Sequence, residues 1–131
     1  TPHVGEFAFL TGLTVKNVEA GRIDEAIRYA KENHVVLVLK GALRLVAVPD
    51  GRAWVNSTGN PGMAAGGMGD TLTGIIAAFI GQGLSAEEAA VTGVYLHGLA
   101  GDLLAEKMPV GYTAGDVARM IPLARKKVIE G

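Results

Sequence analysis

The feature that most constrains the fold is an apolar run, Val35–Leu39, placed directly after an amphipathic segment. The run is rich in β-branched residues and has no polar alternation, which is typical of a strand covered on both faces in a parallel sheet. The preceding segment, Arg22–Asn33, carries apolar residues at helical spacing and predicts a helix with one buried face, made by Ile23, Ala26, Ile27 and Ala30. A helix followed by a buried strand indicates α/β architecture.

A β-hairpin is predicted next. Leu43–Val48 and Arg52–Val55 flank Pro49–Gly51, where proline fixes φ and glycine permits positive φ. The hairpin is expected at a sheet edge. One covered strand and a hairpin do not complete a parallel sheet. We therefore expect residues 1–131 to be a fragment, with the remaining strands of its sheet supplied by an absent N-terminal segment, a separate chain or a swapped copy.

Three helices are predicted in the second half of the chain. The first begins at Asp70 or Thr71 and ends at Gly81 and Gly83, and its apolar face contains Leu72, Ile75, Ile76, Phe79 and Ile80. The second begins with a capping box at Ser85–Glu88 and continues to about Ala105. The third begins near Thr113–Asp116, and Pro122 within it predicts a kink or two short helices.

Composition narrows the class of partner. The net charge is −1 and the pI is about 6.2, so no nucleic-acid or membrane partner is expected, and a small molecule is the better default. The chain has no cysteine, which excludes disulfides and thiolate metal sites and fits a cytoplasmic location. The longest apolar run is far too short to span a bilayer, so a soluble protein is expected.

The chemistry is expected in a glycine-rich segment, Gly59–Asp70, that leads into a helix. The free amides and the dipole of a helix N-terminus stabilise phosphoryl oxygens. The competing interpretation is structural: Asp70 only caps the first turn, since aspartate is a favoured N-cap. Residue physics alone favours neither. The spacing excludes the Walker A and dinucleotide-binding motifs.

Gly67–Asp70 resembles the Gly-x-Gly-Asp anion hole of ribokinase-like enzymes. With its companion motifs, the chain resembles the ADP-dependent NAD(P)H-hydrate dehydratase family over essentially its whole length; those motifs are Thr1–Phe7, Leu39–Ala42, Gly59–Gly62 and Gly93–Gly98. Val4 departs from the family, which usually has proline there. The resemblance implies a ribokinase-like three-layer α/β/α sandwich, of which this chain is the C-terminal portion.

The resemblance also implies an activity, the repair of hydrated NADH or NADPH. A phosphoryl group from ADP is transferred to the hydrate hydroxyl, and phosphate is then eliminated to give NAD(P)H and AMP. Asp70 is the implied catalytic base. The implied holders of the phosphoryl group are Gly67, Met68, Gly69 and Thr71.

Further site residues follow from the same resemblance. Lys40, Gly41, Arg44 and Asn60 are expected to contact ADP or ATP, and His3 and Glu6 are expected to bind the hydrate with Asp70. No metal-binding residues are expected, although Mg²⁺ would accompany the nucleotide. His97 has no partner at metal-ligand spacing and is interpreted as a core histidine.

The expected partners are therefore the NAD(P)H hydrate and ADP or ATP, with a homo-oligomer or association with the N-terminal portion. Two alternatives remain open. One is a ribokinase-like kinase of a vitamin-precursor alcohol, of the hydroxymethylpyrimidine or thiazole type. The other is a catalytically silent fragment that only associates with other chains.

Overall fold

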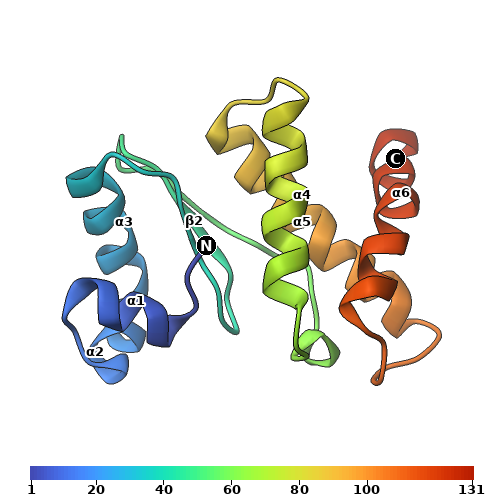
Figure 1. Ribbon diagram of the computed structural model, residues 1–131, viewed down its shortest axis with the longest axis horizontal. Helices are drawn as coiled ribbons and strands as arrows, with labels where there is room; N and C mark the ends of the chain where they lie inside the picture. Colours follow the sequence, from blue (N-terminus) through green and yellow to red (C-terminus); the bar gives the residue numbers. More distant parts are fainter. The chain divides into compact units, whose positions relative to one another are not determined.

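The computed structural model describes residues 1–131 and consists of two compact units, residues 1–56 and 57–131. The first unit has three helices and a small sheet, and the second has three longer helices; their course along the chain can be followed in Figure 1. The bounds in the first unit are α1 (Val4–Thr11), α2 (Val15–Ala20), α3 (Arg22–Asn33), β1 (Leu37–Leu39), β2 (Leu45–Ala47) and β3 (Ala53–Val55).

The sheet of the first unit has the strand order β1-β2-β3 and is antiparallel throughout. The predicted hairpin is confirmed as β2 and β3, with Leu45 opposite Val55. Gly51 in its turn has a φ of 95°. β3 forms one edge of the sheet, as expected of the hairpin.

β1 is buried along its whole length, as predicted, but the expected parallel pairing is not found within this chain. Its one strand partner is β2, with Val38 opposite Val46. The connection from β1 to β2 is only residues 40–44, and a parallel pair needs a crossover of about a dozen residues or more. The other edge of β1 has no strand partner in these 131 residues.

The helices of the first unit cover one face of its sheet. The buried core of this unit consists of Phe7, Ala8, Val18, Ala26, Ala30, Leu37, Leu39, Leu45 and Ala47. Phe7 is fully buried and meets the ring of Tyr29 edge to face, with centroids 5.3 Å apart. α3 has the predicted bounds, but Ile23 is half exposed, so alanines make most of its buried face. The sequence did not predict α1 and α2.

The second unit contains a short 3₁₀ turn, η1 (Pro61–Met63), and the helices α4 (Met68–Gly81), α5 (Ala86–Ala105) and α6 (Ala114–Glu130). α4 begins earlier than predicted because Gly67 adopts a left-handed conformation that lets Met68 enter the helix. The side chain of Met68 is buried in the core of this unit. The predicted end of α4 is confirmed at Gly81, with Gly83 in positive φ.

The capping boxes at the starts of α5 and α6 are confirmed. α6 is one helix of 17 residues that contains Pro122, so of the two predicted outcomes, a kink or two short helices, the second is wrong. Proline removes the amide that would pair with the carbonyl of Ala118. Ala118 and Pro122 are both exposed, so water can satisfy that carbonyl and the helix continues.

Candidate active site

The N-terminus of α4 is the predicted anion site, and it begins without a side-chain cap. Gly67 is the N-cap residue, with a φ of 82°, and the first intrahelical bond runs from the Thr71 amide to the Gly67 carbonyl at 3.0 Å. By contrast, α1, α2, α5 and α6 are each capped by a side chain. The first amides of α4 are therefore left for a ligand or for water.

Asp70 lies in the first turn of α4, three residues after the N-cap, and is exposed. The interpretation of Asp70 as the N-cap of this helix is wrong, because Gly67 occupies that position. The carboxylate therefore lies in the same turn as the free amides of Met68 and Gly69. A base beside a set of oriented N–H donors is the arrangement that phosphoryl transfer to an alcohol requires.

The loop that precedes this site is fastened to α5. Asp102 accepts hydrogen bonds from the Gly59 amide at 2.8 Å and from Asn60 Nδ2 at 2.9 Å. The Asn60 Oδ1 atom accepts from the Gly62 amide at 3.0 Å and from the hydroxyl of Tyr112. Both ends of the Asn60 carboxamide are thus engaged within the protein. Asn60 shapes the loop, and its predicted contact with the nucleotide stays a prediction.

Two glycines of α5 let this loop lie close to the helix. A Cβ on Gly98 would be 2.2 Å from Thr58 Oγ1 and 2.7 Å from the Thr58 carbonyl carbon. A Cβ on Gly101 would be 2.3 Å from the sulfur of Met63, which is buried. Thr58 Oγ1 also donates to the Tyr95 carbonyl at 2.8 Å. Small residues on α5 therefore determine where the loop lies.

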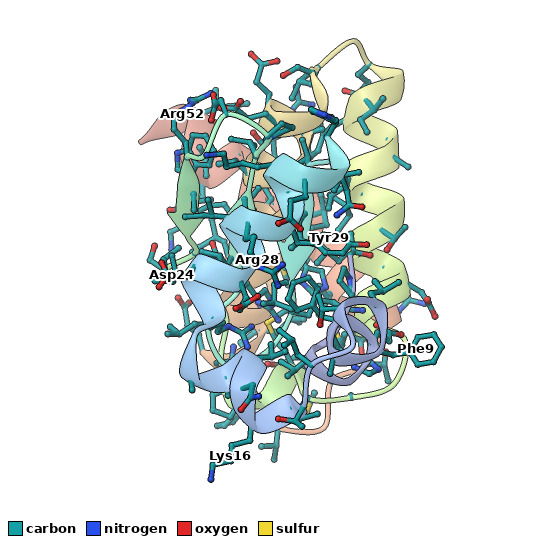
Figure 2. All side chains as sticks on the ribbon, turned by 90° about the vertical axis from the view of Figure 1, so that its left-hand side faces the viewer. Phe9, Lys16, Asp24, Arg28, Tyr29 and Arg52 are labelled. Atoms are coloured by element: carbon teal, nitrogen blue, oxygen red, sulfur yellow. The ribbon has the colours of Figure 1, made fainter.

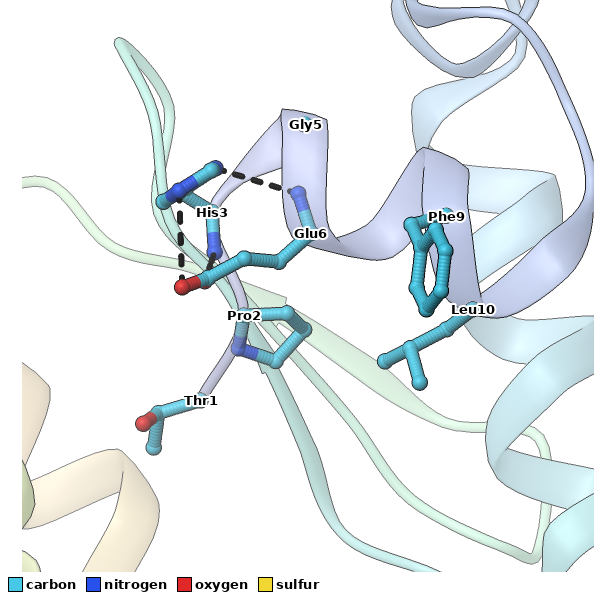
Figure 3. A pocket seen from close by; sticks show the side chains of 7 residues that line it. All are labelled: Thr1, Pro2, His3, Gly5, Glu6, Phe9 and Leu10. Atoms are coloured by element: carbon cyan, nitrogen blue, oxygen red, sulfur yellow. Dashed lines mark hydrogen bonds and ion pairs between the residues drawn. The ribbon is translucent and has the colours of Figure 1, made fainter.

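His3 and Glu6 form a capping box at the start of α1. His3 Nδ1 accepts from the Glu6 amide at 3.2 Å, and Glu6 Oε2 accepts from the His3 amide at 2.7 Å. A His3 Nε2–Glu6 Oε1 contact of 3.4 Å completes the pair (Figure 3). The His3 backbone amide is the main cause that lowers the pKa of Glu6, and the charges of His3 and Lys40 add to it.

Lys40 lies near this pair. Its amide donates to the Pro2 carbonyl at 2.9 Å, and its charge helps to lower the pKa of Glu6. The first unit therefore brings a residue predicted for the nucleotide next to two predicted for the hydrate. Of the other predicted nucleotide residues in this unit, Gly41 is exposed with a φ of 145° and Arg44 is partly buried.

A wide, open hollow of about 690 Å³ lies beside His3 and Glu6. Figure 3 shows the residues that line it, which are Thr1, Pro2, His3, Gly5, Glu6, Phe9 and Leu10. Phe9 is 89% exposed and projects away from α1 (Figure 2). Sequence reasoning missed Phe9 and Leu10, since nothing in their spacing shows that both stay outside the core.

The predicted site residues thus fall into two groups. The first unit contains His3, Glu6, Lys40, Gly41 and Arg44, and the second contains Asn60, Gly67, Met68, Gly69, Asp70 and Thr71.

His97 is 1% exposed inside α5, which agrees with its interpretation as a core residue. No group of three His, Cys, Asp or Glu side chains converges to hold a metal ion. No helix has the length and apolarity needed to cross a bilayer.

The fold, together with a glycine-rich loop that leads into a helix without a side-chain cap, defines a class, the ribokinase-like α/β enzymes. The structure resembles a ribokinase-like superfamily protein from Enterococcus faecalis, with a TM-score of 0.78 and 32% identity, and the match covers 95% of this chain. The similarity to the ADP/ATP-dependent NAD(P)H-hydrate dehydratase of Bacillus subtilis, co-crystallised with ATP and Mg²⁺, is greater: the TM-score is 0.92 at 35% identity over 96% of this chain. The ribokinase-like fold class is thereby confirmed.

Residues 1–123 match the NAD(P)H-hydrate dehydratase family, and the chain belongs to that family. It is 47% identical over 131 residues to the bifunctional NAD(P)H-hydrate repair enzyme Nnr of Thermofilum pendens. It is 45% identical over 122 residues to the ADP-dependent (S)-NAD(P)H-hydrate dehydratase of Xanthomonas campestris. These relatives cover 99% and 93% of the chain.

The chain spans only part of these relatives. It corresponds to 25% of the Thermofilum protein, 41% of the Xanthomonas protein and 47% of the Bacillus structure. The predicted resemblance is confirmed, and the relatives do not favour the vitamin-precursor kinase.

Proposed function

We propose that this chain contributes to the ADP-dependent dehydration of hydrated NADH and NADPH, a hydro-lyase reaction that repairs damaged nucleotides. The observation that carries the proposal is the uncapped N-terminus of α4, with the Asp70 carboxylate exposed in its first turn. Membership of the dehydratase family supports the substrate. The activities named for the Xanthomonas and Bacillus relatives support ADP or ATP as the phosphoryl donor.

In this proposal Asp70 accepts the proton of the hydrate hydroxyl, and the hydroxyl oxygen attacks the terminal phosphorus of ADP. The bond between that phosphorus and the bridging oxygen breaks, and AMP leaves. The phosphorylated hydroxyl then departs as phosphate while a ring proton is lost, which restores the nicotinamide double bond. The amides of Gly67, Met68 and Gly69, with Thr71, stabilise charge on the phosphoryl oxygens during transfer.

The first unit supplies the remaining contacts in this proposal. Lys40, Gly41 and Arg44 contact the nucleotide, and His3 and Glu6 bind the hydrate. The hydrogen bond from the Lys40 amide to the Pro2 carbonyl, 2.9 Å long, lies next to His3 and supports neighbouring contacts for the two ligands. Asn60 contributes by holding the loop in shape and through its backbone.

Mg²⁺ is part of the proposal as a companion of the nucleotide. The chain has no converging set of three acidic or histidine side chains, so phosphate oxygens and water would provide most of its ligands. Bound there, the ion would neutralise phosphate charge. The co-crystallisation of the Bacillus relative with ATP and Mg²⁺ supports this choice.

We further propose that residues 1–131 form the C-terminal portion of one dehydratase domain, which works in the cytoplasm as a homo-oligomer or together with its N-terminal portion. The unpaired edge of β1 and the exposed ring of Phe9 support association. The absence of cysteine supports a reducing compartment.

The test compares two proteins: the 131-residue chain alone, and the polypeptide completed with the N-terminal portion that the relatives carry. Each is incubated with hydrated NADH and either ADP or ATP, and nicotinamide absorbance is followed. Recovery of absorbance with stoichiometric AMP from ADP is expected for the completed protein. A completed protein that instead phosphorylates a vitamin-precursor alcohol, or that turns over neither substrate, would overturn the proposal.

A further inference from the structure

Arg22, the first residue of α3, reaches across to the segment that follows β1. Its Nη2 atom donates to three backbone carbonyls, those of Leu39 at 3.2 Å, Lys40 at 2.7 Å and Leu43 at 2.7 Å. Its Nε atom donates to the Leu43 carbonyl as well, at 3.1 Å. The side chain is only 11% exposed. One guanidinium therefore binds both ends of residues 39–43.

Gly41 lies against the same guanidinium. A Cβ at this position would be 2.6 Å from Arg22 Nη2 and 2.9 Å from Nη1. Gly41 also has a φ of 145°, a value that side chains rarely permit. A side chain at position 41 would overlap the guanidinium, so Arg22 can bind this segment in the observed way because residue 41 is glycine.

The charge of Arg22 is already balanced within the first unit. Its Nη1 atom lies 3.3 Å from Glu19 Oε2, and the remaining donors bind carbonyl oxygens. A flat group with several fixed donors can bind two or three carbonyls together, whereas a lysine ammonium cannot reproduce that fork. The expected contribution of Arg22 is therefore geometrical.

We propose that Arg22 is a positioning residue for the nucleotide: it fixes the conformation of residues 39–43 and so the places of Lys40 and Gly41. This inference rests on the proposed function, in which these two residues contact ADP or ATP. Nothing in the family resemblance assigns a role to Arg22. The hydrate-binding pair, His3 and Glu6, belongs to α1, and its side chains bond to one another's backbone within the capping box.

The test measures steady-state kinetics of the completed polypeptide with Arg22→Lys and Arg22→Gln. Arg28→Gln is the matched control, because Arg28 lies on the same helix (Figure 2) and pairs with Glu25 and Glu32 of that helix. We expect both Arg22 variants to raise KM for ADP by roughly tenfold, with KM for the hydrate and kcat changed less than about threefold. Gly41→Ala should reproduce this pattern, and Arg28→Gln should not.

Hydrogen exchange of the amides of residues 40–44 is measured in the same proteins without ligand. Faster exchange there in Arg22→Lys than in Arg28→Gln supports the positioning role even if the wild-type protein proves to have no dehydratase activity, so the two proposals fail separately. The inference is overturned if exchange in this segment is unchanged. It is also overturned if KM for ADP is unchanged, or if all kinetic constants worsen together with a lowered unfolding midpoint.

Discussion

The carboxylate of Asp102 binds two successive residues of the glycine-rich loop, and its partner Asn60 is held from both sides. Asp102 receives the Asn60 Nδ2 donor at 2.9 Å, while the opposite end of the same carboxamide accepts from the Gly62 amide. This relationship joins α5 to the loop that leads to α4. The position of the candidate anion site therefore depends on a residue more than 30 positions later in the chain.

Asp102→Ala is expected to lower the free energy of unfolding by about 2 kcal/mol, because two donors lose a charged acceptor. Urea denaturation measures the change. Glu106→Ala is the control, since Glu106 lies at the end of the same helix and makes an exposed 4.0 Å contact with Lys127. The control is expected to change stability by less than about 0.5 kcal/mol. Equal effects of both variants would contradict the role given to Asp102.

Gly98→Ala is expected to destabilise the chain by about 1–3 kcal/mol, although alanine is the better helix former. The new methyl group would overlap Thr58, whose backbone cannot move aside easily. Gly74→Ala is the matched change within α4, where a Cβ meets nothing within 4 Å. That variant should gain up to about 1 kcal/mol. Thermal unfolding compares the two, and a stabilised Gly98→Ala protein would show that the loop does not lie against α5.

Asp70→Asn is expected to reduce kcat of the completed polypeptide by at least about 100-fold, because the hydroxyl proton loses its acceptor. The fold should be retained, since Asp70 is exposed. The assay is recovery of nicotinamide absorbance, with circular dichroism as the check on folding.

Asp24→Asn is the control for Asp70→Asn. Asp24 has the same place in α3, three residues after a glycine N-cap without a side-chain cap. Both variants lose the same favourable helix-dipole interaction, worth about 0.3–1 kcal/mol. We expect both variants to show a similar small change in stability. Only Asp70→Asn is expected to lose activity. Near-normal turnover in Asp70→Asn would remove Asp70 as the base.

Stability should fall in acid as the capping boxes of α5 and α6 lose their charge. Hydrogen bonds from Ser85 lower the pKa of Glu88, and the Thr113 amide and hydroxyl, together with Arg119, lower that of Asp116. A lowered pKa in the folded state adds stability above the ordinary values of 4.5 and 3.8. That added stability is lost as the pH falls below these ordinary values and through the lower pKa values that the two carboxyls have in the folded protein.

Urea midpoints measured from about pH 7 to about pH 3 test this dependence. The double variant Glu88→Gln, Asp116→Asn should be less stable than the wild type near neutral pH and should show a shallower decline in acid. Ser85→Ala is an intermediate case, because the Glu88 carboxylate keeps its bond to the Ser85 amide at 2.9 Å. An acid decline as steep as that of the wild type in the double variant would mean that other carboxylates cause it.

The sequence by itself determined the local elements whose signals lie within a few residues. Periodicity, turn chemistry and capping act over short distances. They therefore predicted the helix at Arg22–Asn33, the hairpin turn at Gly51 and the start of α5 at Ser85. The fixed order of the motifs was also enough to identify the family. α1 was missed, since a histidine N-cap at His3 is an unusual start signal.

Only the tertiary structure decided which residues hold the candidate site in place. Arg22 joins α3 to residues 39–43, and Asp102 joins α5 to Asn60. Both contacts link positions separated by 18 or more residues. Periodicity and local propensity describe only neighbouring residues, so they cannot predict these pairings. The pairings depend on how the helices pack, because packing brings together side chains that are far apart in the sequence.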